Sequence, residues 1–337
     1  MRTNMLFTVM TGILFASNTL FLTAQTVASP GWIRVEGNHF VNSAGQTVIF
    51  QGVNFSDPDK LVRAGKWQKA HFEEARNWGA NIIRLPIHPS AWRERGAEEY
   101  LNILDQGIQW AREIGQYIII DWHSIGNLKT GLYQNQSYKT TKEETYEFCR
   151  LVSEQYAREP VVAMYELFNE PTTDNGKLGE VSWQQWKEMN MEMISIIRNN
   201  NPNAVILVTG FDWGYDLTPV KTDPLDAPGI AYVSHPYPQK RDKPWEAKWE
   251  DDWGFVAKDY PVILTEIGFA LPEEKGVHIP VTGDEEYGRA IVDFSAARGI
   301  SWVVWCFDPD WPPYMFTDWK YTPTRQGTFF KEVMSRD

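Results

Sequence analysis

The sequence is constrained most by a regular alternation of apolar runs with longer amphipathic segments. Eight apolar runs predict buried strands at residues 48–55, 81–86, 117–123, 161–170, 204–210, 230–237, 261–268 and 301–307. Helical spacing predicts helices at residues 67–78, 98–114, 141–156, 182–198, 246–258, 284–298 and 328–334. Strands buried on both faces that alternate with helices are typical of a parallel sheet. The chain therefore belongs to the α/β class, and we expect a single (β/α)₈ TIM barrel.

The segments around this core also carry structural signals. Residues 31–45 alternate like two short strands with turns, which predicts a β-hairpin before the first barrel strand. Ser182 is a suitable N-cap for the helix that follows it. A doubly wound open sheet is the alternative fold. If such a sheet bound a nucleotide it would need a glycine-rich phosphate loop after its first strand, and the segment at residues 52–55 is not one.

The first residues resemble a secretory signal peptide. Arg2 precedes an interrupted apolar stretch at residues 5–22, and small residues follow at positions 24–29. An uncleaved anchor is the alternative, but the run is short and broken for a spanning helix. We expect residues 1–28 to be a signal peptide and residues 29–337 to form one catalytic domain. The mature protein is then secreted or periplasmic, with no membrane attachment after cleavage.

Charge and cysteine content exclude several classes of partner. The net charge is −12 and no basic block is present, so nucleic acid is a poor partner. The two cysteines, Cys149 and Cys306, are too few for a disulfide framework and lack the spacing of zinc ligands, so we expect free thiols.

The sixteen tryptophans suit a large core, with some of them free to stack on sugar rings. We expect a monomer.

Two of the predicted strands deliver a carboxylate near their carboxyl ends. The first ends in Asn169-Glu170-Pro171, where proline cannot donate to a sheet and stops the strand. The second carries Glu266 near its end. In a parallel barrel the carboxyl ends of all strands meet at one face, where active sites lie. The alternative for each tip is an ordinary strand end with solvated polar residues.

The other strand ends are also rich in polar or aromatic side chains. They carry Asn54, Arg84, His123, His235, Tyr237 and Trp305. Two facing carboxyl groups suit a retaining glycosidase, in which they lie about 5–5.5 Å apart as nucleophile and acid/base. Their pKa values must differ, so that one group is protonated while the other is ionised. Arg84 and Tyr237 are suited to stabilise an ionised nucleophile, and His235 to tune the acid.

Structural roles remain open for several of these residues. Arg84 also suits the neutralisation of a buried Glu166, and the two roles can coexist. His123 is equally a candidate for a buried core histidine whose hydrogen bonds are made within the protein. Tyr237 and Trp305 are candidates for packing at the carboxyl end of the barrel. A metal held by histidine and glutamate is a further alternative, although no paired-ligand helix motif is present.

Two motifs resemble those of glycoside hydrolase family 5. Tyr165-Glu166-Leu167-Phe168-Asn169-Glu170-Pro171 is similar to the family signature on strand 4, and Thr265-Glu266-Ile267-Gly268 to that on strand 7. The resemblance covers residues 45–310. It implies double displacement, with Glu170 as acid/base, Glu266 as nucleophile, and no cofactor or metal. The family's other recurrent active-site positions match Arg84, His123, Asn169, His235, Tyr237 and Trp305.

The resemblance also implies a β-linked polysaccharide or oligosaccharide as substrate. Endo-β-1,4-glucanase is our first expectation because it is the family's commonest activity; an endo-acting mannanase or xyloglucanase is the alternative. A non-catalytic glycan-binding barrel is a hypothesis from another class. Four tryptophans that follow predicted strands are candidates for lining a cleft or for packing in the core: Trp92, Trp122, Trp213 and Trp311.

Overall fold

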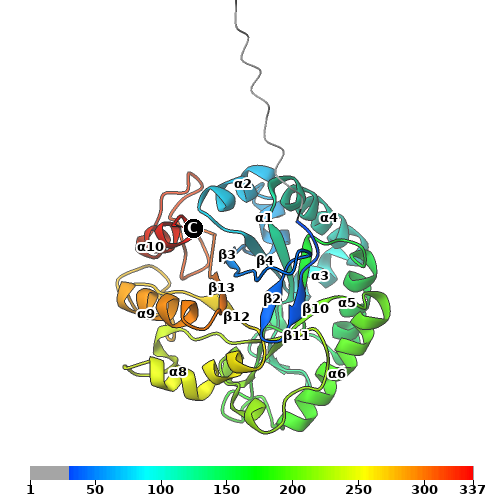
Figure 1. Cartoon of the computed structure of the whole chain (residues 1–337). Coiled ribbons are helices and arrows are strands. Elements are labelled where there is room, and N and C mark those ends of the chain that lie inside the picture. The colour runs from blue at the N-terminus through cyan, green and yellow to red at the C-terminus, as the bar shows by residue number, and fades with distance from the viewer. Residues whose placement is uncertain (1–29, 337) are drawn as a thin grey trace, which may run out of the picture.

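The computed structural model describes residues 30–336, and its centre is a closed barrel of eight strands (Figure 1). The strands are β3 (Gln51–Asn54), β4 (Ile82–Ile87), β5 (Tyr117–Trp122), β8 (Val162–Glu166), β10 (Val205–Thr209), β11 (Ile230–Val233), β12 (Val262–Ile267) and β13 (Ser301–Val304). Every neighbouring pair is parallel, and β13 pairs with β3 to close the ring. The predicted (β/α)₈ barrel is therefore confirmed, and the open sheet is excluded.

The strands form because their side chains are buried on both faces. Residues such as Ile119, Met164 and Leu207 form a small apolar cluster inside the barrel. The residues that alternate with them along the strands, such as Ile118 and Tyr165, belong to a much larger cluster between the strands and the helices. Continuous burial explains why these strands appear in the sequence as apolar runs without a polar face.

The predicted hairpin is present as β1 (Arg34–Glu36) and β2 (His39–Val41), which pair antiparallel. Ile33, just before β1, and Phe40 of β2 join Phe50 in the cluster inside the barrel. The hairpin therefore covers the amino-terminal end of the barrel with apolar side chains. The opposite end is left for polar residues.

Helices surround the barrel on its outside (Figure 1). The longer ones are α2 (Lys69–Asn77), α4 (Ala97–Ile114), α5 (Lys142–Gln155), α6 (Trp183–Asn200), α9 (Glu285–Ala296) and α10 (Arg325–Met334). The shorter ones are α1 (Pro58–Arg63), α3 (Pro89–Arg95), α7 (Phe211–Gly214) and α8 (Glu246–Asp252), with 3₁₀ turns η1 (Gln136–Tyr138), η2 (Thr218–Lys221), η3 (Pro238–Lys240) and η4 (Gly254–Lys258). Ser182 caps α6 in a reciprocal capping box with Gln185, which confirms the predicted helix start.

Several predicted strand ends were wrong. The strand predicted at residues 161–170 leaves the barrel after Glu166. Glu170 instead starts β9 (Glu170–Pro171), which joins β6 (Ile125–Asn127) and β7 (Leu132–Tyr133) in a small sheet. The backbone of Glu170 donates to the Ser124 carbonyl, and this loop-to-loop bond redirects the chain. The strands predicted to reach residues 237 and 307 likewise stop at Val233 and Val304.

One predicted helix was also too long, because the segment at residues 246–258 is α8 followed by the 3₁₀ turn η4.

Cys149 and Cys306 are free and buried, as expected. The predicted signal peptide at residues 1–28 lies outside the described residues. Within residues 30–336 no helix combines the length and apolar character needed to cross a membrane.

Candidate active site

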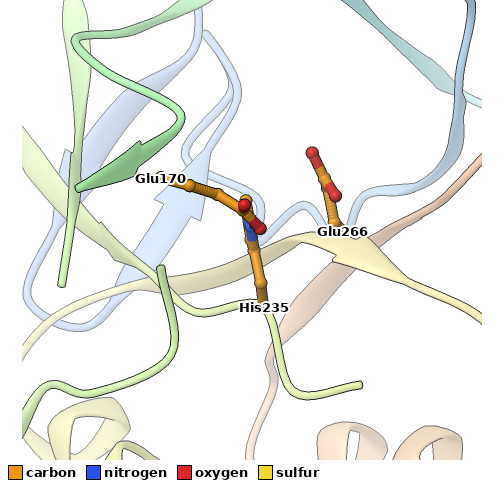
Figure 2. A group of neighbouring side chains, drawn as sticks. All are labelled: Glu170, His235 and Glu266. Atoms are coloured by element: carbon orange, nitrogen blue, oxygen red, sulfur yellow. The ribbon is translucent and has the colours of Figure 1, made fainter. Parts of the chain in front are cut away.

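A cavity of about 940 Å³ opens at the carboxyl ends of the barrel strands. Glu170 and Glu266 both line it, together with Asn169, Tyr237 and Trp305. Glu266 comes from β12 and Glu170 from β9, and Figure 2 shows the two side chains reaching toward the same space from different segments. The fold thus brings together two carboxyl groups that are distant in the sequence.

Glu266 is held by two hydrogen-bond donors. Its Oε2 accepts from the Tyr237 hydroxyl at 2.8 Å, and its Oε1 accepts from Arg84 Nη1 at 3.1 Å. Burial raises the pKa of Glu266, and the charge of Arg84 and the Tyr237 hydrogen bond oppose that rise. Burial also raises the pKa of Tyr237 well above its usual value, so the phenol stays a donor. These contacts favour the ionised carboxylate of Glu266.

Glu170 has a different environment. Its Oε1 lies 3.0 Å from His235 Nδ1, and its side chain is buried. Burial raises the pKa of Glu170 to about 7, against the opposing charges of Lys240 and Arg84. Burial lowers the pKa of His235 to about 4, so the imidazole is neutral near neutral pH. Glu170 therefore keeps a proton at a pH where an exposed glutamate has lost it.

The spacing of this pair limits the chemistry. Oxygen atoms of Glu170 and Glu266 and a ring nitrogen of His235 all lie within 4.8 Å of one another. This separation is close to the roughly 5–5.5 Å of retaining glycosidases and leaves no room for the extra water of an inverting one. A metal ion here would have to displace a partner of His235, because its Nδ1 contacts Glu170 and its Nε2 contacts Thr265.

Arg84 lies at the centre of the charged network and is fully buried. It binds Glu166 with two nitrogens, at 2.7 and 3.0 Å, and also contacts Glu266. Its Nη2 lies 2.7 Å from Asn169 Oδ1 and 2.9 Å from Asp121 Oδ2. Burial alone would lower the pKa of Arg84, but the surrounding carboxylates raise it overall. Arg84 therefore neutralises Glu166 and contacts Glu266 at the same time.

His123, Asn169 and Trp305 complete the predicted set at the cavity wall. His123 Nδ1 lies 2.7 Å from Asp121 Oδ2, and its ring stacks on Trp305 with centroids 5.3 Å apart. Burial lowers the pKa of His123 well below its usual range, so its ring is neutral. Asn169 uses Oδ1 for Arg84, while its buried Nδ2 has no hydrogen-bond partner among the described residues. That amide is a free donor at the cavity.

Two of the four candidate cleft tryptophans do line the cavity. Trp311 stacks on Trp305 with centroids 5.9 Å apart, and Trp213 lies on the wall beside Lys240. The expectation for Trp92 and Trp122 was wrong, because both are buried away from the cavity. Trp122 points to the helix side of β5 and donates to Thr145 of α5. Trp92 packs edge-on against Trp122, in the same layer between strands and helices.

Sequence reasoning missed some residues of the site. Asp121 precedes His123 by two positions, so strand alternation would have placed both on one face. Thr265 immediately precedes Glu266, and a register shift in β12 between Leu264 and Ile267 lets both neighbours reach the site. Tyr138 of η1 and Lys240 of η3 also line the cavity, and no strand pattern marks them.

The fold and the site together define a barrel protein with a buried pair of carboxyl groups at the carboxyl ends of its strands. The profile of the Cellulase (glycosyl hydrolase family 5) family matches residues 41–310, and the chain belongs to this family. The resemblance inferred from the strand 4 and strand 7 motifs is thereby confirmed.

Characterised relatives and solved structures agree with this family. An endoglucanase from Paenibacillus polymyxa is 24% identical, over 86% of this chain and 83% of the relative. Endoglucanase A from Butyrivibrio fibrisolvens is 27% identical, and the chain spans about half the length of that relative, 54%. A β-glucanase from Saccharophagus degradans, crystallised with cellotetraose, is 45% identical with a TM-score of 0.90, over 96% of this chain and 97% of that one.

Proposed function

We propose that the protein is a retaining endo-β-1,4-glucanase that cleaves a β-glucan by double displacement. The observation that carries this proposal is the pair Glu170 and Glu266, whose oxygens approach within 4.8 Å in one cavity. Membership of the family and the cellotetraose bound by the Saccharophagus degradans β-glucanase support a glucan as substrate.

In the first step Glu266 acts as nucleophile. Its carboxylate attacks the anomeric carbon, while Glu170 gives its proton to the departing glycosidic oxygen. The bond from carbon to that oxygen breaks, and an ester between Glu266 and the sugar forms. Tyr237 and Arg84 support this role because both donate to the Glu266 carboxylate.

In the second step Glu170 acts as base. It takes a proton from water, and the water oxygen attacks the anomeric carbon and releases Glu266. The sugar leaves with its original configuration and Glu170 is protonated again. The proposed reaction uses the two carboxyl groups and water, so we assign it no cofactor and no metal.

The walls of the cavity suit a sugar chain. The free Nδ2 of Asn169 is suited to donate to a sugar hydroxyl near the reacting carbon. Trp311 and Trp213 offer flat faces for stacking along the cavity, and Trp305 lies at its wall between His123 and Trp311. His123 packs against Trp305 and fixes the plane of its ring.

Conservative variants test the assignment of the two carboxyl groups. Glu170→Gln and Glu266→Gln should each lower turnover on barley β-glucan by about two orders of magnitude or more, because each removes one proton donor or nucleophile. Glu332→Gln, on the exposed side of α10, is the matched control and should keep full activity. Circular dichroism verifies the fold of each variant. Full activity in either active-site variant refutes the assignment.

A substrate panel tests the polymer. Activity on barley β-glucan and carboxymethyl cellulose that exceeds activity on glucomannan, xyloglucan and xylan supports the glucanase. Preference for glucomannan or xyloglucan would replace it with the mannanase or xyloglucanase alternative. Absence of reducing-sugar release from every polymer, together with binding, would favour the non-catalytic glycan-binding barrel.

We also propose that the protein acts outside the cytoplasm after removal of residues 1–28. The proposal rests on the pattern of Arg2, the apolar residues 5–22 and the small residues at 24–29. Amino-terminal sequencing of the protein recovered from the medium or periplasm should find a first residue near position 29. A mature protein that still begins at Met1 would contradict it.

A further inference from the structure

Thr265 lies between His235 and Glu166 in the buried network next to the carboxyl pair. Its hydroxyl oxygen is 2.9 Å from His235 Nε2 and 3.0 Å from Glu166 Oε1. Thr265 is fully buried on β12 and does not line the cavity. It therefore affects a bound sugar through other residues and does not touch the sugar itself.

The direction of these hydrogen bonds follows from the chemistry of the groups. Both oxygens of Glu166 accept from Arg84, so this carboxylate is an acceptor. The Thr265 hydroxyl has a single proton, which it donates to Glu166. The lone pairs of the same oxygen then face His235 Nε2, and that nitrogen must carry a proton to bond with them.

A neutral imidazole with its proton on Nε2 has a lone pair on Nδ1. That lone pair faces Glu170 Oε1 at 3.0 Å, and a hydrogen bond across this gap requires the proton to be on Glu170. The ring is held at both nitrogens, because Nδ1 lies 3.0 Å from Glu170 Oε1 and Nε2 lies 2.9 Å from Thr265 Oγ1. The neutral state agrees with the lowered pKa of about 4 for His235.

We propose that Thr265 is a positioning residue that fixes the tautomer of His235 and so keeps the acid proton on Glu170. The inference rests on the proposed role of Glu170 as acid/base. In the first step the proton passes from Glu170 to the glycosidic oxygen. The resulting carboxylate then faces the lone pair on His235 Nδ1, which favours its taking a proton from water in the second step.

The opposite tautomer would have the opposite effect. With its proton on Nδ1, His235 would donate to Glu170 and stabilise the carboxylate, which lowers the pKa of Glu170. The tautomer of one buried histidine thus determines whether Glu170 holds a proton over the pH range in which the acid step takes place.

Thr265→Val removes the hydroxyl while keeping the shape of the side chain, and Thr265→Ser keeps the hydroxyl as the matched control. In the valine variant the high-pH limb of kcat/KM on barley β-glucan should move down by about one pH unit, the size expected for one hydrogen bond. Activity should then be about tenfold lower at pH 8 and little changed at pH 5. The serine variant should keep the limb of the unmodified protein.

A purely structural role for Thr265 would give a different result. The valine variant would then lose kcat/KM equally at every pH, with the limb in place, and that outcome overturns the inference. With 2,4-dinitrophenyl β-cellobioside, whose leaving group needs no proton, the rate of the first step in the valine variant should approach that of the serine variant. An equal defect on both substrates also overturns it.

The failure of this inference can be told apart from failure of the proposed function. A fully active Glu170→Gln variant would refute the acid/base role itself. An inactive Glu170→Gln variant beside an unshifted Thr265→Val variant would refute the tautomer inference alone. The unmodified protein gives a readout that needs no variant to fold: ¹⁵N spectra of its histidine rings should show His235 protonated on Nε2, and protonation on Nδ1 contradicts the inference.

Discussion

At the scale of residues, burial raises the pKa of both carboxyl groups, Glu170 and Glu266. Their different hydrogen-bond partners then favour different protonation states. Glu266 gains two donors, Tyr237 and Arg84, while Glu170 faces the ring of a neutral His235. Similar burial with different hydrogen-bond partners therefore yields one group suited to ionisation and one suited to carry a proton.

The first residue-scale prediction concerns pH. Glu170 must be protonated to act as an acid, and its pKa of about 7 predicts that kcat/KM falls above pH 7. Glu266 must be ionised, so kcat/KM also falls on the acid side, through a pKa that burial has raised. A bell-shaped profile with its maximum below pH 7 is expected on barley β-glucan. A plateau that continues into alkaline pH would contradict the role of Glu170.

The second residue-scale prediction concerns Tyr237. Tyr237→Phe removes a donor to the Glu266 carboxylate, and a hydrogen bond to a charged group contributes about 1.5–3 kcal/mol. We expect kcat/KM to fall about 10- to 150-fold and the acid limb to move to higher pH. Tyr146→Phe, which removes a tyrosine bond to Glu192 far from the cavity, is the control. An unmoved acid limb in Tyr237→Phe would show that the phenol does not stabilise the carboxylate.

At the scale of elements, strands and helices were predictable where one pattern repeats. The runs that became β5 and β12 are apolar because both of their faces are buried, and this burial is a property of the sequence itself. Strand ends were less predictable, because Glu170 is placed by a bond from its backbone to Ser124 in another loop. Trp92 and Trp213 both follow strands, and the fold of each loop alone decides which one reaches the cavity.

The element-scale prediction concerns the start of α6. The Ser182 side chain accepts from the Gln185 backbone and Gln185 accepts from the Ser182 backbone. Ser182→Ala should lower the free energy of unfolding by about 1 kcal/mol, because the backbone N–H of Gln185 loses its side-chain acceptor. Ser182→Asp restores an acceptor and should recover most of this loss in chemical denaturation. Equal stability of the alanine variant and the unmodified protein would argue against the cap.

At the scale of the whole molecule, the two ends of the barrel have separate tasks. The amino-terminal end is covered by the hairpin, whose Phe40 packs inside the barrel, while the carboxyl-terminal end carries the cavity. The sequence predicted the polar carboxyl-terminal end, because polar residues gather at the ends of the apolar runs, and it predicted a hairpin without its place at the other end. It could not predict the cavity walls, which are loops from many parts of the chain.

This division leads to a prediction that separates stability from activity. Phe40→Ala should lower the free energy of unfolding by about 3–5 kcal/mol, because a buried aromatic side chain is lost. Turnover per folded molecule at low temperature should stay unchanged. Trp32→Ala, an exposed aromatic beside the same hairpin, is the control and should cost little stability. A large loss of turnover in folded Phe40→Ala would show that the two ends are coupled.

Trapping the proposed intermediate tests the central claim most directly. A 2,4-dinitrophenyl 2-deoxy-2-fluoro-β-cellobioside keeps a good leaving group for the first step and slows the second, so the glycosyl-enzyme accumulates. Mass spectrometry of the intact protein should find one fluorocellobiosyl group per chain, and peptide mapping should locate it on Glu266. A label on Glu170 or another residue, or a first product of inverted configuration, would contradict the account.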